Sequence, residues 1–250
     1  LVLDAGNLFF KQNKIDPGIS LDAAKENAYT IVEAFNHISC DAFSPGVKDF
    51  AAGLDFLNIL SSKSKFDYIS CNIKNEDNGL IFKPYKIIDQ DGFNFGIIGV
   101  SSYFESNEVV IDDPYESINK VISEIESKCD CIVLLFNASD SDYKKLFQSD
   151  LAVDLIIRGN TRKKSISGGK NSTPVYSTGD RGRALYQFDL KYINDIDPLL
   201  DVAYFEKEIK SNTKRMNQLI QNSGDEDKIK EYENNIEGYN HAIDNIKNSL

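Results

Sequence analysis

The stretch Asp154 to Arg162 carries the side chains that are best placed for chemistry. It reads Asp-Leu-Ile-Ile-Arg-Gly-Asn-Thr-Arg, an apolar strand that ends in a glycine turn. α/β proteins place their ligand sites at the sheet edge where such strands end. The polar groups on offer are the amide of Asn160 and the guanidinium groups of Arg158 and Arg162. Guanidinium groups pair with carboxylates or hold anions such as phosphate, and an amide lacks the imidazole that suits transition metals.

Other catalytic patterns are missing from the sequence. There is no Gly-x-Ser-x-Gly elbow and no phosphate-binding Gly-Lys-Ser/Thr loop, and the chain has only two histidines, His37 and His241. His37 ends a predicted helix, where a histidine is typical of a partner for the helix dipole. Ser139, Asp140 and Asp142 follow a strand-like run and are typical of helix caps.

Composition bounds the class of protein. The chain has 250 residues, 41% apolar content, a formal charge of -11 and a pI near 4.7. These values indicate a globular protein and argue against a nucleic-acid binder, which needs clustered Lys and Arg. The longest apolar runs are far shorter than the roughly 20 residues that cross a bilayer. Because Leu1 already lies in a strand-like run, we expect a segment upstream of it.

The four cysteines, Cys40, Cys71, Cys129 and Cys131, form no Cys-x-x-Cys pair and no haem motif. Cys71 and Cys131 lie in apolar runs, where we expect small buried hydrophobes, although the disulfide state of all four is left open.

Local signals predict the elements that position these residues. Ser20 caps a helix that runs to Ile38, and Asp113 followed by Pro114 begins another with a regular apolar stripe. Asp91-Gly92 joins a predicted hairpin. Strands are predicted at 1–4, 66–72, 83–88, 93–100, 131–136 and 184–192, the last from its two-residue alternation.

After Asp197-Pro198 the pattern changes to apolar residues at alternating spacings of three and four. Two arms, separated near 222–225, predict an antiparallel helical hairpin or coiled-coil arm over 198–250, beside a domain over 1–197. Asn212 occupies one core position and is expected to help fix the register. We favour two helices packed on each other or on the domain; the alternative is an arm that docks a protein partner or a second copy through Tyr232, Tyr239 and His241.

Several segments in order resemble the 5'-nucleotidase branch of the calcineurin-like metallophosphatases. The stretch from Asp154 is similar to that family's Asp-Leu-Ile-Ile-Gly-Gly-His-Thr-His, and Leu3 to Asn7 is similar to Leu-Asp-Ala-Gly-Asp. The segment 41–50 resembles Asp-Ala-x-x-x-Gly-Asn-His-Glu-Phe, and the strand ending at Asn137 occupies the place of a strand that ends in a metal-binding His. The resemblance covers about residues 1–192. It implies an α/β sandwich of two mixed sheets flanked by helices.

The same resemblance implies a site for two metal ions whose ligands are replaced here. The family's bridging Asp, its Asn and its histidines correspond to Asn7, Val47, Lys48, Asn137, Asn160 and Arg162. A neutral amide and an isopropyl group cannot replace a bridging carboxylate and an amide ligand. We therefore expect no catalytic residue, no metal and no cofactor. Lys48, Arg158 and Arg162 then either pair with Asp4 or Asp49 as an inert plug, which we favour, or bind an anion.

Two functions follow from this reading. We favour a non-catalytic pseudophosphatase that acts as a binding or scaffolding module; the alternative is a divergent metal-dependent phosphoesterase or 5'-nucleotidase. The resemblance also implies a periplasmic or extracellular location, since most such nucleotidases are secreted or surface-anchored. Neither a nucleic-acid partner nor a membrane span in this chain is expected.

Overall fold

The computed structural model describes residues 1–250 except 147, 150, 163, 170–171, 181, 192–198, 200–201, 223–224 and 249–250. The described chain forms two compact units, one of Leu1–Ser165 with Val175–Tyr186 and one of Ile166–Pro174 with Gln187–Leu250. The domain boundary predicted between residues 197 and 198 lies outside the described residues. Among the helices that are described, none is both long and apolar enough to cross a membrane.

The first strands form a small parallel sheet beside an aromatic core. They lie in the order β1-β2-β3, and both pairings are parallel. Helix α1 begins where predicted, because the Ser20 hydroxyl accepts the N–H of Ala23 at 3.1 Å. Rings pack edge to face within the core, as Phe43 and Tyr68 do at a centroid distance of 4.9 Å. These elements are β1 (Leu3–Asp4), α1 (Leu21–His37), β2 (Ala42–Phe43), η1 (Val47–Phe50), α2 (Leu54–Lys63) and β3 (Asp67–Tyr68).

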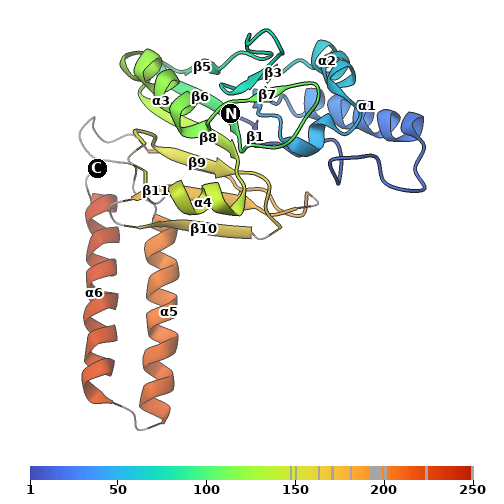
Figure 1. Cartoon of the computed structure of the whole chain (residues 1–250). Helices are drawn as coiled ribbons and strands as arrows, with labels where there is room; N and C mark the ends of the chain where they lie inside the picture. Colours follow the sequence, from blue (N-terminus) through green and yellow to red (C-terminus); the bar gives the residue numbers. More distant parts are fainter. Residues whose placement is uncertain are drawn as a thin grey trace. The chain divides into compact units, whose positions relative to one another are not determined.

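A six-stranded mixed sheet carries the second core. Its order is β10-β11-β9-β8-β6-β5; β5 and β6 are antiparallel, and β6, β8, β9 and β11 are mutually parallel. All residues of β8 are buried, as expected for a central strand covered on both faces. Figure 1 shows α3 along this sheet, where its apolar stripe joins the core. The bounds are β5 (Tyr85–Gln90), β6 (Phe93–Ser101), α3 (Pro114–Ile125), η2 (Glu126–Lys128), β8 (Cys131–Asn137), α4 (Asp140–Leu146), β9 (Leu155–Arg158), β10 (Lys164–Gly169) and β11 (Ser172–Thr178).

Local signals placed these elements well. Asp113 caps α3 by accepting the N–H groups of Tyr115 and Glu116 at 2.9 and 3.0 Å, and Asp91-Gly92 forms the β5-β6 turn with both residues at positive φ. Cys71 and Cys131 are buried, and all four thiols are free. A further two-stranded antiparallel sheet pairs β4 (Ile73–Lys74) with β7 (Val110–Ile111).

The strand predicted at 184–192 is wrong. Residues 184–191 form no strand, and Tyr192 lies outside the described residues. The predicted alternation is present, since Ala184, Tyr186 and Phe188 are partly covered while Leu185 is 86% exposed. In the strand order of the sheet β11 lies between β10 and β9, and this extended segment has no place in that order.

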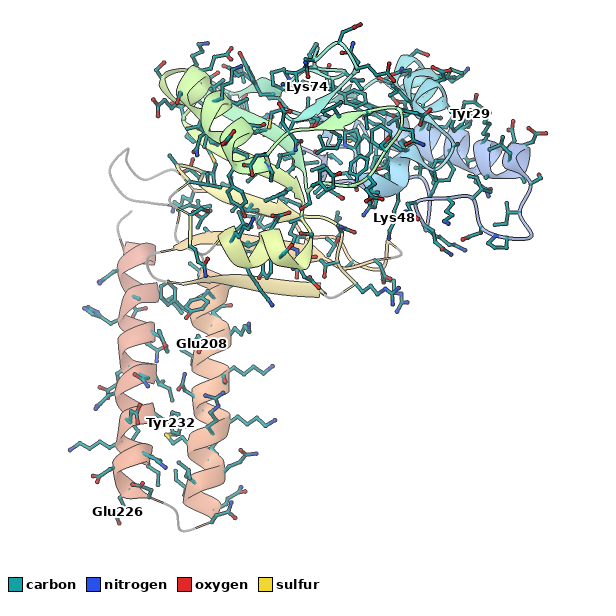
Figure 2. The ribbon with its side chains drawn as sticks, viewed as in Figure 1. Tyr29, Lys48, Lys74, Glu208, Glu226 and Tyr232 are labelled. Carbon is teal, nitrogen blue, oxygen red and sulfur yellow. The ribbon has the colours of Figure 1, made fainter. Side chains whose placement is uncertain are left out.

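The second unit contains the predicted helical hairpin, α5 (Val202–Gln221) and α6 (Glu226–Asn248), whose helices lie side by side in Figure 1. The ring of Tyr239 lies 6.1 Å from that of Phe205, and Tyr232 lies between the helices (Figure 2), both half-buried. His241 is exposed. Asn212 is buried in the seam, but its amide donates at 2.7 Å to Glu208 O of its own helix.

Candidate functional site

The carboxyl ends of strands from both sheets of the first unit meet at one place. We call it the strand-end junction; it consists of the last residue of β8, Asn137, and of the residues that follow β1, β2 and β9, namely 5–7, 44–49 and 159–160. Direct contacts bring these segments together: Asn137 Nδ2 donates to Ala5 O at 2.9 Å, and Asn7 Nδ2 donates to Asn160 Oδ1 at 3.1 Å. Five predicted site residues, Asn7, Val47, Lys48, Asn137 and Asn160, therefore lie at one edge.

Asp49 organises this junction through backbone hydrogen bonds. Its Oδ1 accepts the N–H groups of Leu8 and Phe9 at 2.8 and 3.0 Å, and its Oδ2 accepts those of Asn7 and Gly46 at 2.7 and 2.8 Å. The residue is 1% exposed. Both carboxylate oxygens are thus committed to the loop after β1 and to the start of η1.

Asn7 and Asn160 form an amide pair on unusual backbone. Their φ angles are 62° and 54°, in the left-handed region where Asn is one of the tolerated residues. Asn7 Oδ1 also accepts the N–H of Lys48 at 3.0 Å. The side chains of Asn7 and Asn160 therefore form hydrogen bonds with each other and, through Asn7 Oδ1, with the neighbouring backbone.

Asn137 is buried in the junction, 1% exposed, with glycines close to its amide. A methyl group on Gly6 or Gly159 would lie 2.8 or 2.9 Å from Asn137 Nδ2, closer than real Cβ contacts come, so only glycine lets these backbones approach. Asn137 Oδ1 and Ser44 Oγ are buried without a hydrogen-bond partner.

The predicted ion-pair plug is wrong. Within the described residues, neither Lys48 nor Arg162 forms an ion pair with Asp4 or Asp49. The reason is that Asp49 is already saturated by backbone N–H groups. Lys48 lies half-buried in η1 (Figure 2), and Arg162 is exposed two residues beyond Asn160.

Arg158 has a different role from the one expected at the strand edge. It is 6% exposed and donates from Nη2 to Asp140 Oδ1 at 2.6 Å, and its guanidinium carbon lies 3.9 Å from the ring centroid of Tyr143. Its Nε is buried without a partner. These contacts join the end of β9 to α4.

Burial perturbs the two carboxylates on this side of the fold. Loss of hydration raises the pKa of Asp4 to about 7, although the N–H of Gly6 opposes the rise and the charge of Asp49 adds to it. Loss of hydration also raises the pKa of Asp49 to about 6 against the effect of its four N–H donors.

These residues do not fit a pair of divalent cations. Asp49 has no free lone-pair direction toward a cation, and Val47 offers no donor atom. The side-chain amides of Asn7 and Asn160 are hydrogen-bonded to each other. In the part of the chain that is described, no group of three or more His, Cys, Asp or Glu side chains is placed to hold a metal.

Sequence reasoning missed the role of Asp49 and of the glycines. The available signal for Asp49 was its place before Phe50, because the family that the segment 41–50 resembles has Glu-Phe there. Buried Asn72 was also missed; its amide donates to Ser101 O and Asp112 O at 2.7 and 3.0 Å and accepts Ser101 N–H at 3.1 Å. Its role is to join β4 to β6.

Solved structures with a similar architecture include phosphoesterases and nucleotidases. The calcineurin-like phosphoesterase YfkN of Bacillus subtilis aligns with a TM-score of 0.56 at 20% identity, over 72% of this chain and 67% of its own. The NAD nucleotidase NadN of Haemophilus influenzae aligns with a TM-score of 0.55 at 19% identity, over 72% of this chain and 35% of its own. The 5'-nucleotidase precursor of Thermus thermophilus gives 0.54 at 20%, over 71% and 38%.

The chain thus spans little more than a third of the length of the two nucleotidases. Neither a protein-family model nor a curated protein sequence matches it. At these identities the likeness concerns the fold. The α/β architecture, with its parallel strand ends meeting at one junction, is the fold of these phosphoesterase and nucleotidase structures.

Proposed function

We propose that this chain is a non-catalytic pseudophosphatase that acts as a binding or scaffolding module. The observation that carries the proposal is the state of Asp49, whose two oxygens accept four backbone N–H groups. A carboxylate held in this way stabilises loops and has no capacity left to bind a cation or to activate water. The positions expected to ligate metals offer no replacement carboxylate or imidazole; they are Asn7, Val47, Lys48, Asn137, Asn160 and Arg162.

The helical hairpin is the surface that we assign to a protein partner or to a second copy. His241 is exposed on α6 and is available for contact, whereas Tyr232 and Tyr239 are half-buried toward α5 and present only part of their rings. An envelope location, periplasmic or extracellular, belongs to the same proposal; it is supported by the nucleotidase precursor among the structural neighbours.

A metal-dependent phosphoesterase is the second candidate, and the neighbours favour it. YfkN and NadN carry phosphoesterase and NAD nucleotidase names, and they share the fold at TM-scores of 0.56 and 0.55. This function requires ligands other than the replaced positions. Lys48, Arg158 and Arg162 would then contact a phosphate group, with Arg158 first released from Asp140.

A phosphatase assay on the purified chain of residues 1–250 separates the two candidates. With Mn²⁺ or Zn²⁺ and either p-nitrophenyl phosphate or a nucleoside monophosphate as the substrate, we expect no phosphate release above the rate without protein. Release that a chelator abolishes, together with near-stoichiometric metal in the purified protein, would establish the phosphoesterase instead.

Partner binding is tested at the exposed residue of the hairpin. His241→Ala leaves the Phe205–Tyr239 contact in place, so we expect an unchanged helix signal in circular dichroism. We expect weaker self-association in sedimentation velocity or weaker capture of an envelope protein. Lys210→Ala on α5 is the control. Equal binding by the wild type and both variants would argue against the assigned surface.

A further inference from the structure

Asn137 and Gly46 are in close contact in the strand-end junction. A methyl group built on Gly46 would overlap the Asn137 amide, since the nearest atoms to it are Cγ, Oδ1 and Nδ2 of that side chain. Asn137 ends β8, and Gly46 precedes η1, so the contact joins the six-stranded sheet to the layer of β1 to β3.

The backbone of Gly46 does not itself require glycine. Its φ and ψ are -114° and 176°, which is ordinary extended backbone for any residue. Glycine is needed at this position because the amide of Asn137 occupies the space of a side chain. Residue 46 and residue 137 are therefore matched in size.

The hydrogen bonds of Asn137 alone do not account for its position. Nδ2 donates to Ala5 O, but Oδ1 is a buried acceptor without a donor, which is unfavourable. Either close packing holds the amide in spite of this cost, or Oδ1 faces a cation. The donor set decides between the two: Ser44 Oγ is the other unpartnered buried oxygen of the junction, and a hydroxyl with an amide oxygen is a poor site for a divalent ion.

We infer that the amide of Asn137, enclosed by Gly46, Gly6 and Gly159, closes the junction as a packed protein contact that needs no metal. The layers of the first unit are held together here by this contact and by the hydrogen bonds from Asn137 to Ala5 O and from Asn7 to Asn160. The inference rests on the proposed function, because both require a junction without cations.

A double-mutant cycle on the chain of residues 1–250 tests the contact. Gly46→Ala is expected to lower the thermal unfolding midpoint by roughly 5–10 °C, because the new methyl group displaces the amide. In an Asn137→Ala background the amide is absent, so the same Gly46→Ala change is expected to cost little more. Gly238→Ala, at a position with open space, is the matched control and is expected to have the same effect in both backgrounds.

The same melts are recorded with a chelator and with added Mn²⁺ or Zn²⁺. We expect the wild-type midpoint to be unchanged by either. A midpoint that rises with Mn²⁺ or Zn²⁺, and no longer does so in Asn137→Ala, would make Oδ1 a cation ligand and overturn the inference. An equal cost of Gly46→Ala in both backgrounds would overturn it too. Phosphate release in the separate assay would instead refute the proposed function while leaving the cycle intact.

Discussion

Asn7 donates its side-chain N–H to Asn160 Oδ1 at 3.1 Å, across 153 residues of sequence. Asn7 follows β1 and Asn160 follows β9, and these two strands belong to different sheets. Their pairing shows how polar side chains at the strand ends of this fold bind one another, and the energetic consequences can be measured.

Replacing Asn7 separates the cost of its hydrogen bonds from that of its backbone. Asn7→Gly and Asn7→Ala both lose the bonds to Asn160 and to the N–H of Lys48, but only alanine is strained at a φ of 62°. We expect the alanine variant to be less stable than the glycine variant by about 1 kcal/mol in urea denaturation. Equal stabilities would mean that the left-handed backbone relaxes in the variants.

The raised pKa of Asp4 predicts a stability that increases on acidification. With a pKa of about 7 in the folded protein against an ordinary value of 3.8, Asp4 holds a proton between these pH values that the unfolded chain has released. The free energy of unfolding is therefore expected to fall as pH rises from 5 to 7, by up to about 1.4 kcal/mol per pH unit for one linked proton.

Asp4→Asn provides the control for this pH dependence. The slope between pH 6 and 7 should disappear in this variant, while the slope that Asp49 contributes below its pKa of about 6 remains. An identical pH dependence in the wild type and the variant would show that Asp4 is ionised in the folded protein at pH 6.

The ion pair at the end of β9 predicts an asymmetric response to mutation. Arg158 is buried while the side chain of Asp140 is 90% exposed. Asp140→Ala leaves a buried guanidinium without its carboxylate, and we expect a loss of about 2–3 kcal/mol. Arg158→Met keeps an apolar chain against Tyr143 and removes the buried charge, so we expect a change within about 1 kcal/mol. Chemical denaturation of both variants checks this order, and a larger loss for Arg158→Met would show that the pair itself stabilises the fold.

Gly238 in the middle of α6 is a site for stabilising the hairpin. An added methyl group meets no atom within 4 Å, and alanine is the better helix former by about 0.5–1 kcal/mol. We expect Gly238→Ala to raise the melting temperature followed by helical circular dichroism. Gly53→Ala, at a φ of 88°, is the opposite control and is expected to lower it. The idea fails if Gly238→Ala is no more stable than the wild type.

Sequence alone predicted what depends on near neighbours. Ser20 and Asp113 cap helices with their own following residues, so α1 and α3 begin where expected. The strand over 184–192 was wrong because a strand needs a neighbour to pair with, and residues 184–191 pair with no strand of the sheet. Alternation shows which side chains are covered, and it does not show whether a partner strand is present.

The interior of the junction lay beyond sequence reasoning for the same reason. The family resemblance brought together Asn7, Asn137 and Asn160, but the partner that it suggested for Lys48 and Arg162 was wrong. Asp49 instead binds N–H groups about 40 residues away, beyond β1. The closeness of Gly46 to Asn137 likewise depends on how two layers meet, which no periodicity records.

The positive φ angles at positions 7 and 160 limit which amino acids these loops accept. Besides glycine, the residues that adopt such angles most readily are Asn, Asp and His. The resemblance puts Asp and His at these two positions, and this chain has Asn at both. Asp, His and Asn therefore all tolerate the backbone angles at these two positions. A cation-binding side chain there can be replaced by an amide without a change in the backbone of either loop.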